Sequence, residues 1–421
     1  MRNCIPCASA DSAVCGENCR LKTAAPFQRQ FLIILLVSVF LPFLCSVCGC
    51  TTTPRHADSF SSPADSTLTL LFAGDIMAHK PNFMMRGYDK IWADIAGTVS
   101  SADFSFANIE APVSENLPWS AYPNFCMKPD YPAAAISAGF NVFSLVNNHT
   151  NDQGLPGMKD TSAWAETVHA ESKNGEHGRT VYFSGLKQNP EDDYSWCIIQ
   201  KDGWTVLFLA VTEILNRPDY TSYMNYVPNT RNGRSEFISY IQKLRLENPC
   251  DIFVLSLHSD EEEYVKPVLE ERRDYYHTLL ENGVDIIWAN HPHIIREREL
   301  IGDMQSGNLK KLILYGNGNT ISGQRREPQL DNPTNKRDFT GDGLLFEVTF
   351  SKNPGTKKSI IKKTKPYYIT TYINTDGEFI IRTLDSDFAE YLKNEGRNKW
   401  ASYIQKRIEI CGETEETTVW Q

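Results

Sequence analysis

The chain has 421 residues, of which 41% are apolar and 11% aromatic, so it can bury a sizeable core. This composition excludes a disordered chain, a collagen-like chain and a small disulfide-stapled scaffold. The 52 acidic residues outnumber the 42 basic ones and give a formal net charge of -10, which argues against a nucleic-acid partner.

The first fifty residues have the layout of an export segment and contain Cys4, Cys7, Cys15, Cys19, Cys45, Cys48 and Cys50. Residues 31–47 form an apolar run behind three basic residues, as in a secretory signal, and the run is short for a membrane span. The sequence VCGC at 47–50 resembles a bacterial lipobox. We therefore expect Cys50 to be acylated and to anchor the exported protein. The alternatives are an uncleaved anchor and ordinary signal cleavage nearby.

From residue 67, short apolar runs alternate with helical stretches, which predicts an α/β fold. Helices are predicted at 131–138 and 265–282, each ending at a glycine, and over 385–408. Later strands are predicted at 344–350, 367–373 and 379–383, with a hairpin turn at Asp376-Gly377. The basic stretch 352–365 is expected to be a solvated loop.

Five predicted strands end in side chains that can bind a metal or take part in catalysis. They are 68–73 before Asp75, 142–146 before Asn148 and His149, 252–257 before His258, 284–289 before His291 and His293, and 312–315 before the segment GNGN at 316–319. Sites in open α/β sheets form at the carboxyl ends of strands, so these side chains are expected to converge.

The His291-Pro292-His293 motif is the strongest of these signals. Two imidazoles at the end of an apolar strand are costly to bury unless they are protonated, hydrogen-bonded or metal-bound, and the proline stiffens their spacing. Two exposed loop histidines are the alternative. Asn148 and His149 with Asp152 suit a metal ligand beside a general acid and its orienting group. A polar cap of the next helix is the alternative there.

Two other strand ends are ambiguous by themselves. His258 precedes the acidic run 261–263, and such runs are usually solvated helix starts. Asp75 could be a turn or capping residue. Together, however, these strand ends supply mixed nitrogen and oxygen ligands that suit one or two Mn, Fe or Zn ions. Such ions polarise a phosphoryl or acyl oxygen and lower the pKa of a bound water towards about 7.

Five motifs resemble, in order, those of the CapA-type capsule and poly-γ-glutamate synthesis proteins. They are GDIM at 74–77, ANIEAPVS at 107–114, NNHTNDQG at 147–154, HPH at 291–293 with Glu299 beyond it, and YGNGN at 315–319. The resemblance implies a metallophosphatase-like four-layer sandwich, with two mixed β-sheets flanked by helices. We therefore expect an export segment at 1–50, a flexible tether at 51–66, this domain at 67–323, and a C-terminal extension at 324–421 whose β-hairpin and helix pack on it.

The resemblance also implies a site. Its metal ligands would be Asp75, Glu110, Asn148, His258, His291 and His293, with Glu110 in place of the bridging Asp of metallophosphatases. His149 would be the proton donor or oxyanion stabiliser, and Asp152 would orient it. Asn108 would hold Glu110 or touch substrate, and Asn319 lies where the late motif closes the site.

The function implied by the resemblance is the synthesis, export or anchoring of an anionic surface polymer at the bacterial cell envelope. The expected partners are the polymer or its precursor, the membrane through the lipid anchor, and polymer synthesis and export proteins. Three interpretations stay open: a metal-dependent hydrolase or phosphoesterase, a non-catalytic lipoprotein that binds and assembles polymer through a metal, and a metallophosphoesterase unrelated to capsule. Sequence does not show whether Cys126, Cys197, Cys250 and Cys411 form disulfides in an oxidising compartment.

Overall fold

Residues 66–175 and 178–421, which the computed structural model describes, form a mixed α/β fold, as predicted. The expected export segment with Cys50, and nearly all of the expected tether at 51–66, lie outside these residues. Among the described residues, every helix is too short or too polar to cross a membrane. Cys126, Cys197, Cys250 and Cys411 are free thiols.

Two blocks of parallel strands carry the predicted strand ends. The first block is β1 (Thr67–Ile76), β2 (Phe104–Ile109), β3 (Val142–Ser144) and β4 (Tyr182–Ser184). The second block is β6 (Trp204–Thr212), β7 (Ile252–His258), β8 (Ile286–Asn290) and β10 (Asn308–Leu314). Because parallel strands end at the same edge of a sheet, each block gathers its strand-end side chains in one place.

Two long C-terminal strands connect these blocks. β12 (Asp342–Lys352) pairs antiparallel with β1, and β13 (Ser359–Ile373) pairs antiparallel with both β12 and β10. The strand order in the described residues is therefore β4-β3-β2-β1-β12-β13-β10-β8-β7-β6-β5, with β5 (Trp196–Lys201) at the far edge. Strand pairing thus gives one continuous sheet where two separate sheets were expected. The C-terminal strands lie in its middle, and the expected boundary at 323 and 324 stays a prediction.

The extra length of β13 is the reason for this continuity. Residues 359–365 belong to the stretch expected to be a solvated loop, but they extend β13, and Ile361 pairs with Leu309 of β10. The hairpin from β13 to β14 (Phe379–Thr383) forms as predicted. Three shorter pairings complete the sheet: β9 (Arg298–Asp303) with β10, β15 (Glu416–Trp420) with β9, and β11 (Asn319–Ile321) with β1.

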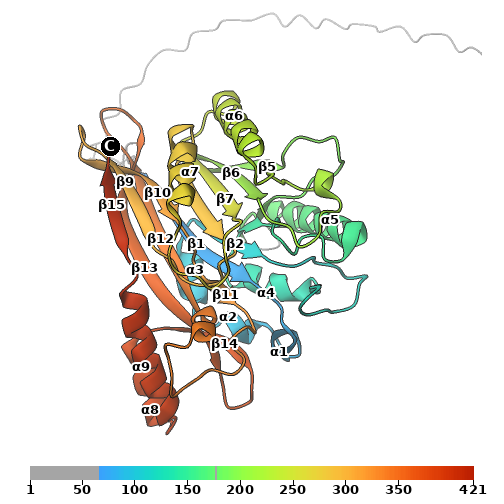
Figure 1. Cartoon of the computed structure of the whole chain (residues 1–421), viewed down its shortest axis with the longest axis vertical. Coiled ribbons are helices and arrows are strands. Elements are labelled where there is room, and N and C mark those ends of the chain that lie inside the picture. Colours follow the sequence, from blue (N-terminus) through green and yellow to red (C-terminus); the bar gives the residue numbers. More distant parts are fainter. Residues whose placement is uncertain (1–65, 176–177) are drawn as a thin grey trace, which may run out of the picture. The chain divides into compact units, whose positions relative to one another are not determined.

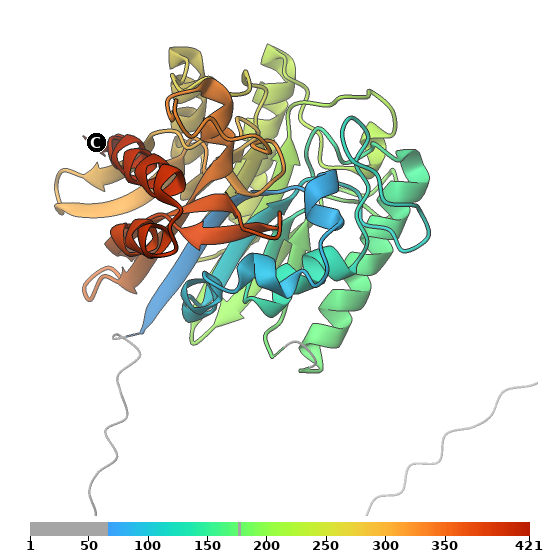
Figure 2. The ribbon, with the colours of Figure 1, turned by 90° about the horizontal axis from the view of Figure 1, so that it is seen from below.

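Helices cover the outer faces of the sheet (Figure 1). They are α1 (Lys80–Phe83), α2 (Asp89–Trp92), α3 (Ala96–Ser101), α4 (Asp130–Ser137), α5 (Gly154–Lys173), α6 (Arg231–Glu247), α7 (Glu270–Glu281), α8 (Ser386–Asn394) and α9 (Asn398–Gly412), with 3-10 turns η2 (Thr221–Tyr223) and η3 (Lys336–Gly341). The red α8 and α9 lie on the side of the molecule away from the green α5 (Figure 2).

Two helix predictions need correction. The stretch 385–408 forms two helices, because the chain turns at Gly396, whose φ is 73°. The helix predicted at 265–282 begins only at Glu270. Pro267 lacks an N–H and disfavours helical geometry in the residue before it, so residues 259–269 form a loop. This loop reaches the candidate site described below.

The two halves of the sheet pack against each other through apolar side chains. In β6, residues 206, 208 and 210 enter one core and residues 207, 209 and 211 enter a second core beneath α6 and α7. Ring contacts cross the first core, at 5.4 Å between Phe106 and Phe208 and 6.0 Å between Phe72 and Trp288. This packing brings the carboxyl ends of both parallel blocks together.

Candidate metal centre

A backbone-to-backbone contact between β1 and β11 forms one side of the site. Asp75 ends β1, pairs with Asn319 in parallel register, and donates its N–H to the Gly318 carbonyl at 3.1 Å. The approach requires glycine at position 74, because a Cβ there would lie 1.8 Å from the Gly318 oxygen. Asn108, on β2, donates from Nδ2 to Asp75 Oδ1 at 2.8 Å. Asn108 therefore holds Asp75, and no hydrogen bond joins it to Glu110 in the described residues.

His293 lies among the carboxylates at this edge. Its Nδ1 is 3.0 Å from Asn319 Oδ1 and 3.2 Å from Asp75 Oδ2, and its Nε2 is 3.6 Å from Glu110 Oε1. Asn319 is itself fixed, since its amide donates to Gln324 Oε1 at 2.9 Å. Asn319 thus positions an imidazole, as well as completing the pairing with β1.

The backbone of the His-Pro-His motif is strained. His291 has φ of 102° and His293 has φ of 56°, in the left-handed region that residues other than glycine rarely adopt. Such conformations persist where the surrounding structure enforces them, and they cluster at functional sites. The strain and the burial of both rings argue against the alternative of two exposed loop histidines.

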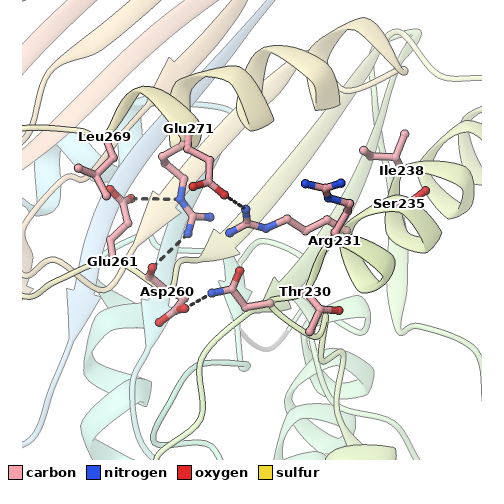
Figure 3. A pocket seen from close by; sticks show the side chains of 11 residues that line it. Thr230, Arg231, Ser235, Ile238, Asp260, Glu261, Leu269 and Glu271 are labelled. Carbon is pink, nitrogen blue, oxygen red and sulfur yellow. Dashed lines mark hydrogen bonds and ion pairs between the residues drawn. The ribbon is translucent and has the colours of Figure 1, made fainter.

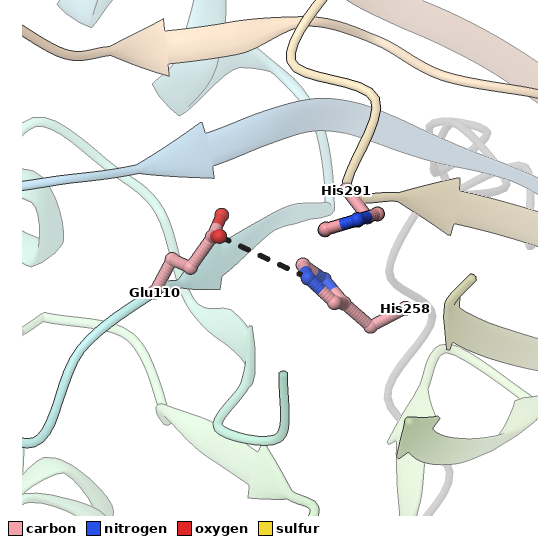
Figure 4. Close-up of side chains that lie close together, drawn as sticks. All are labelled: Glu110, His258 and His291. Atoms are coloured by element: carbon pink, nitrogen blue, oxygen red, sulfur yellow. Dashed lines mark ion pairs between the residues drawn. The ribbon is translucent and has the colours of Figure 1, made fainter. Parts of the chain in front are cut away.

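A second group of ligand atoms surrounds the other side of Glu110. His258 Nε2 is 3.8 Å from Glu110 Oε1 and 2.9 Å from Asn148 Oδ1. The His291 ring lies 5.0 Å from the His258 ring between centroids. Figure 4 shows Glu110, His258 and His291 converging on one point from separate strand ends. Asn148 joins this group through His258.

The ligand atoms fall into two triads that share Glu110, and we call these the two triads below. One is Glu110, His258 and His291, and the other is Asp75, Glu110 and His293, with the ligand atoms of each within 4.8 Å of one another. Among the described residues, neither oxygen of Glu110 has a hydrogen-bond partner, and Nδ1 of His258 and of His291 has none either. Buried charged and polar groups without partners are costly, and a divalent cation would satisfy them. The residues therefore fit one or two ions.

The pKa values of these groups are shifted by burial. Burial and the neighbouring Asp75 raise the pKa of Glu110 well above its ordinary value. Burial and the facing His291 lower the pKa of His258 well below its ordinary value, and burial with His293 lowers that of His291 to about 4. Both imidazoles are therefore neutral at pH 7, which is the form that binds a metal.

His149 and Asp152 form a hydrogen-bonded pair next to the two triads. His149 Nδ1 lies 2.7 Å from Asp152 Oδ2, and the same oxygen accepts the Phe125 N–H at 2.7 Å. The bond occupies Nδ1 and leaves Nε2 as the nitrogen that can exchange a proton with a bound molecule. These residues do not cap the next helix, because the residue at the N-cap of α5 is Gln153.

A cleft of about 860 Å³ opens beside this machinery. His149 and His293 line it, together with Tyr264, and the C-terminal segment 325–338 contributes several of its other lining residues. His79 also lines it, and burial lowers the pKa of His79 to about 3. A molecule in this cleft would meet the proposed proton donor and one triad together.

Sequence reasoning missed two residues of the loop after β7. Glu263 forms a further ligand group with His291 and His293, and the Tyr264 ring stacks on His293 at 6.1 Å between centroids. Burial raises the pKa of Glu263, but His293 and the Tyr264 hydroxyl outweigh burial and lower it below its ordinary value. Pro267 was the available signal, because it argues against a solvated helix start at this acidic run.

Glu299, which follows the His-Pro-His motif, lies elsewhere. Its carboxylate is 2.8 Å from His277 Nε2 and accepts the Tyr315 hydroxyl at 3.1 Å. Neither partner belongs to the two triads. Glu299 therefore joins α7 to the sheet.

A second cleft, of about 580 Å³, lies between α6 and α7 (Figure 3). Its charged side chains largely pair with one another: Arg234 lies 3.2 Å from Glu271, and Arg272 donates to the Asp260 carbonyl at 3.1 Å. None of the predicted site residues lines it. The chemistry of the strand ends therefore belongs to the first cleft.

Known proteins match this chain over most of its length. It is 24% identical over 391 residues to the PGA biosynthesis protein CapA of Bacillus subtilis (strain 168), covering 87% of this chain and 94% of the relative. It is 23% identical over 327 residues to the capsule biosynthesis protein CapA of Bacillus anthracis, covering 71% and 73%. A crystal structure of a hypothetical protein from Thermus thermophilus has 14% identity and a TM-score of 0.38, covering 72% of this chain and 98% of that one, which carries no argument.

A family model gives the assignment. The model described as bacterial capsule synthesis protein PGA_cap matches residues 69–324, which is more than half of the chain and includes all five motifs. The resemblance predicted from those motifs is thereby confirmed. The chain belongs to the bacterial capsule synthesis protein PGA_cap family.

Proposed function

We propose that this protein is a metal-dependent hydrolase or phosphoesterase that acts on an anionic surface polymer, or on its precursor, in capsule or poly-γ-glutamate synthesis, export or anchoring. The observation that carries the proposal is the position of Glu110 in both triads, with the His149–Asp152 pair beside them. The names of the two relatives, which refer to capsule and PGA biosynthesis, support the substrate class.

The side chains divide the work. Asp75, Glu110, His258, His291 and His293 would hold one or two divalent ions, with Asn148 as a further oxygen ligand. A bound ion polarises a phosphoryl or acyl oxygen and lowers the pKa of a nearby water.

The remaining polar side chains orient and transfer. His149, oriented by Asp152, donates a proton to the leaving group from Nε2. Asn108 and Asn319 keep Asp75 and His293 in place. The buried surroundings strengthen each of these electrostatic interactions.

The proposal includes the setting of the molecule. Acylated Cys50 anchors the exported protein to the membrane at the cell envelope, where it meets polymer synthesis and export proteins and no nucleic acid. Mass spectrometry of the mature N-terminus tests this point, and an unmodified first residue other than Cys50 would contradict it. We further propose that the two facing halves of the sheet correspond to the two sheets of a metallophosphatase-like sandwich.

The catalytic part is tested with the full-length protein loaded with Mn²⁺. We expect turnover of a γ-linked glutamyl polymer or of a generic phosphodiester, and loss of that turnover in His149→Ala with metal content unchanged. His169→Ala is the matched control, since His169 lies away from the triads and bonds the Val181 carbonyl at 2.6 Å.

Other outcomes identify the alternatives. Metal-dependent polymer binding without turnover would indicate a non-catalytic assembly protein. Turnover of phosphodiesters alone, with no effect on polymer, would indicate a metallophosphoesterase unrelated to capsule.

A further inference from the structure

The wall of the cleft opposite His149 comes from residues beyond the match to the family model, which ends at residue 324. Three arginines of this segment line the cleft. Arg325 is buried and paired with Asp342 at 2.9 Å, and the exposed Arg326 lies 3.5 Å from Glu327. Arg337 differs from both, because no carboxylate within the described residues forms an ion pair with it. Its positive charge is available to a bound molecule.

Arg337 is connected to the metal centre through a single aromatic ring. Its guanidinium lies 5.1 Å from the Tyr264 ring centroid, and that ring stacks on His293. The Arg337 Nε donates to the Gln324 carbonyl at 3.1 Å, and Gln324 Nε2 donates to the Tyr264 hydroxyl at 3.3 Å. These bonds hold the guanidinium at one end of the cleft, with His293 at the other side of the tyrosine.

The backbone under Arg337 is also fixed. The Asn335 side chain accepts the Arg337 N–H at 2.9 Å at the start of η3. The next residue, Asp338, is buried and accepts the Gln329 N–H and the Tyr403 hydroxyl, each at 2.9 Å. A side chain that is ordered before binding loses less entropy when it binds a ligand.

We propose that Arg337 is the residue that recognises an oxyanion of the substrate, a carboxylate or a phosphate, next to the bond held at the metal centre. Its planar guanidinium can donate two parallel hydrogen bonds to such a group, and Tyr264 supports it from below by a cation–π contact. This inference rests on the proposed function, since it assumes that the substrate lies in the first cleft. It assigns part of the specificity to a segment that the family model does not cover.

The test measures equilibrium binding to the full-length protein by titration calorimetry, in EDTA and again with Mn²⁺. The two probes are a γ-linked glutamate decamer and inorganic phosphate. We expect Arg337→Gln to weaken binding of at least one probe about tenfold under both conditions, and Arg337→Lys to recover part of the loss. Arg231→Gln is the control, because it removes an exposed arginine from the second cleft. Thermal melting checks that all variants fold.

Each result decides between the two levels of the proposal. Unchanged binding of both probes by Arg337→Gln would overturn the role of Arg337 and leave the proposed function intact. Wild-type protein that binds phosphate but not the decamer, with Arg337→Gln weakening phosphate alone, would support the oxyanion site and contradict the polymer as substrate. Wild-type protein that binds neither probe would contradict both.

Discussion

Two buried polar clusters in this molecule satisfy their charges in opposite ways. Asp342, at the start of β12, accepts hydrogen bonds from Arg325 at 2.9 Å and from Arg407 Nε at 2.6 Å. Glu110 is equally buried, but none of the described residues donates a hydrogen bond to it. The first cluster is complete within the chain and fastens α9 to the sheet. The second lacks a positive partner, and this difference distinguishes a structural cluster from a binding site.

The largest expected effect comes from removing imidazoles of the two triads. His291→Ala combined with His293→Ala takes one nitrogen ligand from each, so affinity for Mn²⁺ should fall by more than roughly a hundredfold. Metal analysis after dialysis measures the change, with His169→Ala as control. A double variant that retains stoichiometric metal would place the ion elsewhere.

The Asp342 cluster should respond in stability alone. Arg407→Ala leaves a buried carboxylate with one arginine fewer, and we expect the free energy of unfolding to fall by about 3 kcal/mol. Urea denaturation measures this value. Lys406→Ala, which removes an exposed neighbour, should cost less than about 1 kcal/mol. Equal losses in the two variants would show that the buried pairs contribute no more than surface ones.

Glu110→Gln should separate stability from metal binding. In EDTA the variant should be more stable than wild type by about 1 to 2 kcal/mol, because it removes a buried carboxylate that has no hydrogen-bond donor. The same variant should lose the stabilisation that Mn²⁺ gives to wild type. If Glu110→Gln destabilised the metal-free protein, the carboxylate would have partners within the chain.

The smallest effect concerns the pair between His277 and Glu299. The hydrogen bond to Glu299 raises the pKa of His277 above 6.5, so the pair contributes stability that is fully present below about pH 6.5 and is lost as pH rises through the folded pKa. His277→Gln should therefore cost less than about 1 kcal/mol at pH 6 and almost nothing at pH 9. A loss that is equal at both pH values would contradict this account.

Local patterns were enough to predict much of the site. His258, His291 and His293 each follow an apolar run, and such runs form buried strands whose ends converge. Glu110 required the family resemblance, because the short strand β2 before it was not recognised from its pattern. Arg337 and Tyr264 could not be predicted, since their places depend on tertiary packing of loops.

The sheet teaches the same lesson at a larger scale. The apolar pattern predicted β1, β6, β7 and β12, which are buried along most of their length. It did not predict that the basic residues of β13 continue a strand, because their pairing partners on β12 and β10 define the strand. Strand continuity is thus decided by neighbours distant in sequence.

The contact at Gly74 also bears on the order in which the protein folds. Gly74 donates its N–H to the Thr320 hydroxyl, 246 residues further along the chain. Closing so long a loop is entropically costly, and structures dominated by distant contacts fold slowly. Asp75 can therefore meet His293 and Asn319 only after most of the chain has been synthesised and the two parallel blocks have docked. Metal uptake should accordingly lag behind burial of the tryptophans during refolding, and its rate would report the final assembly step.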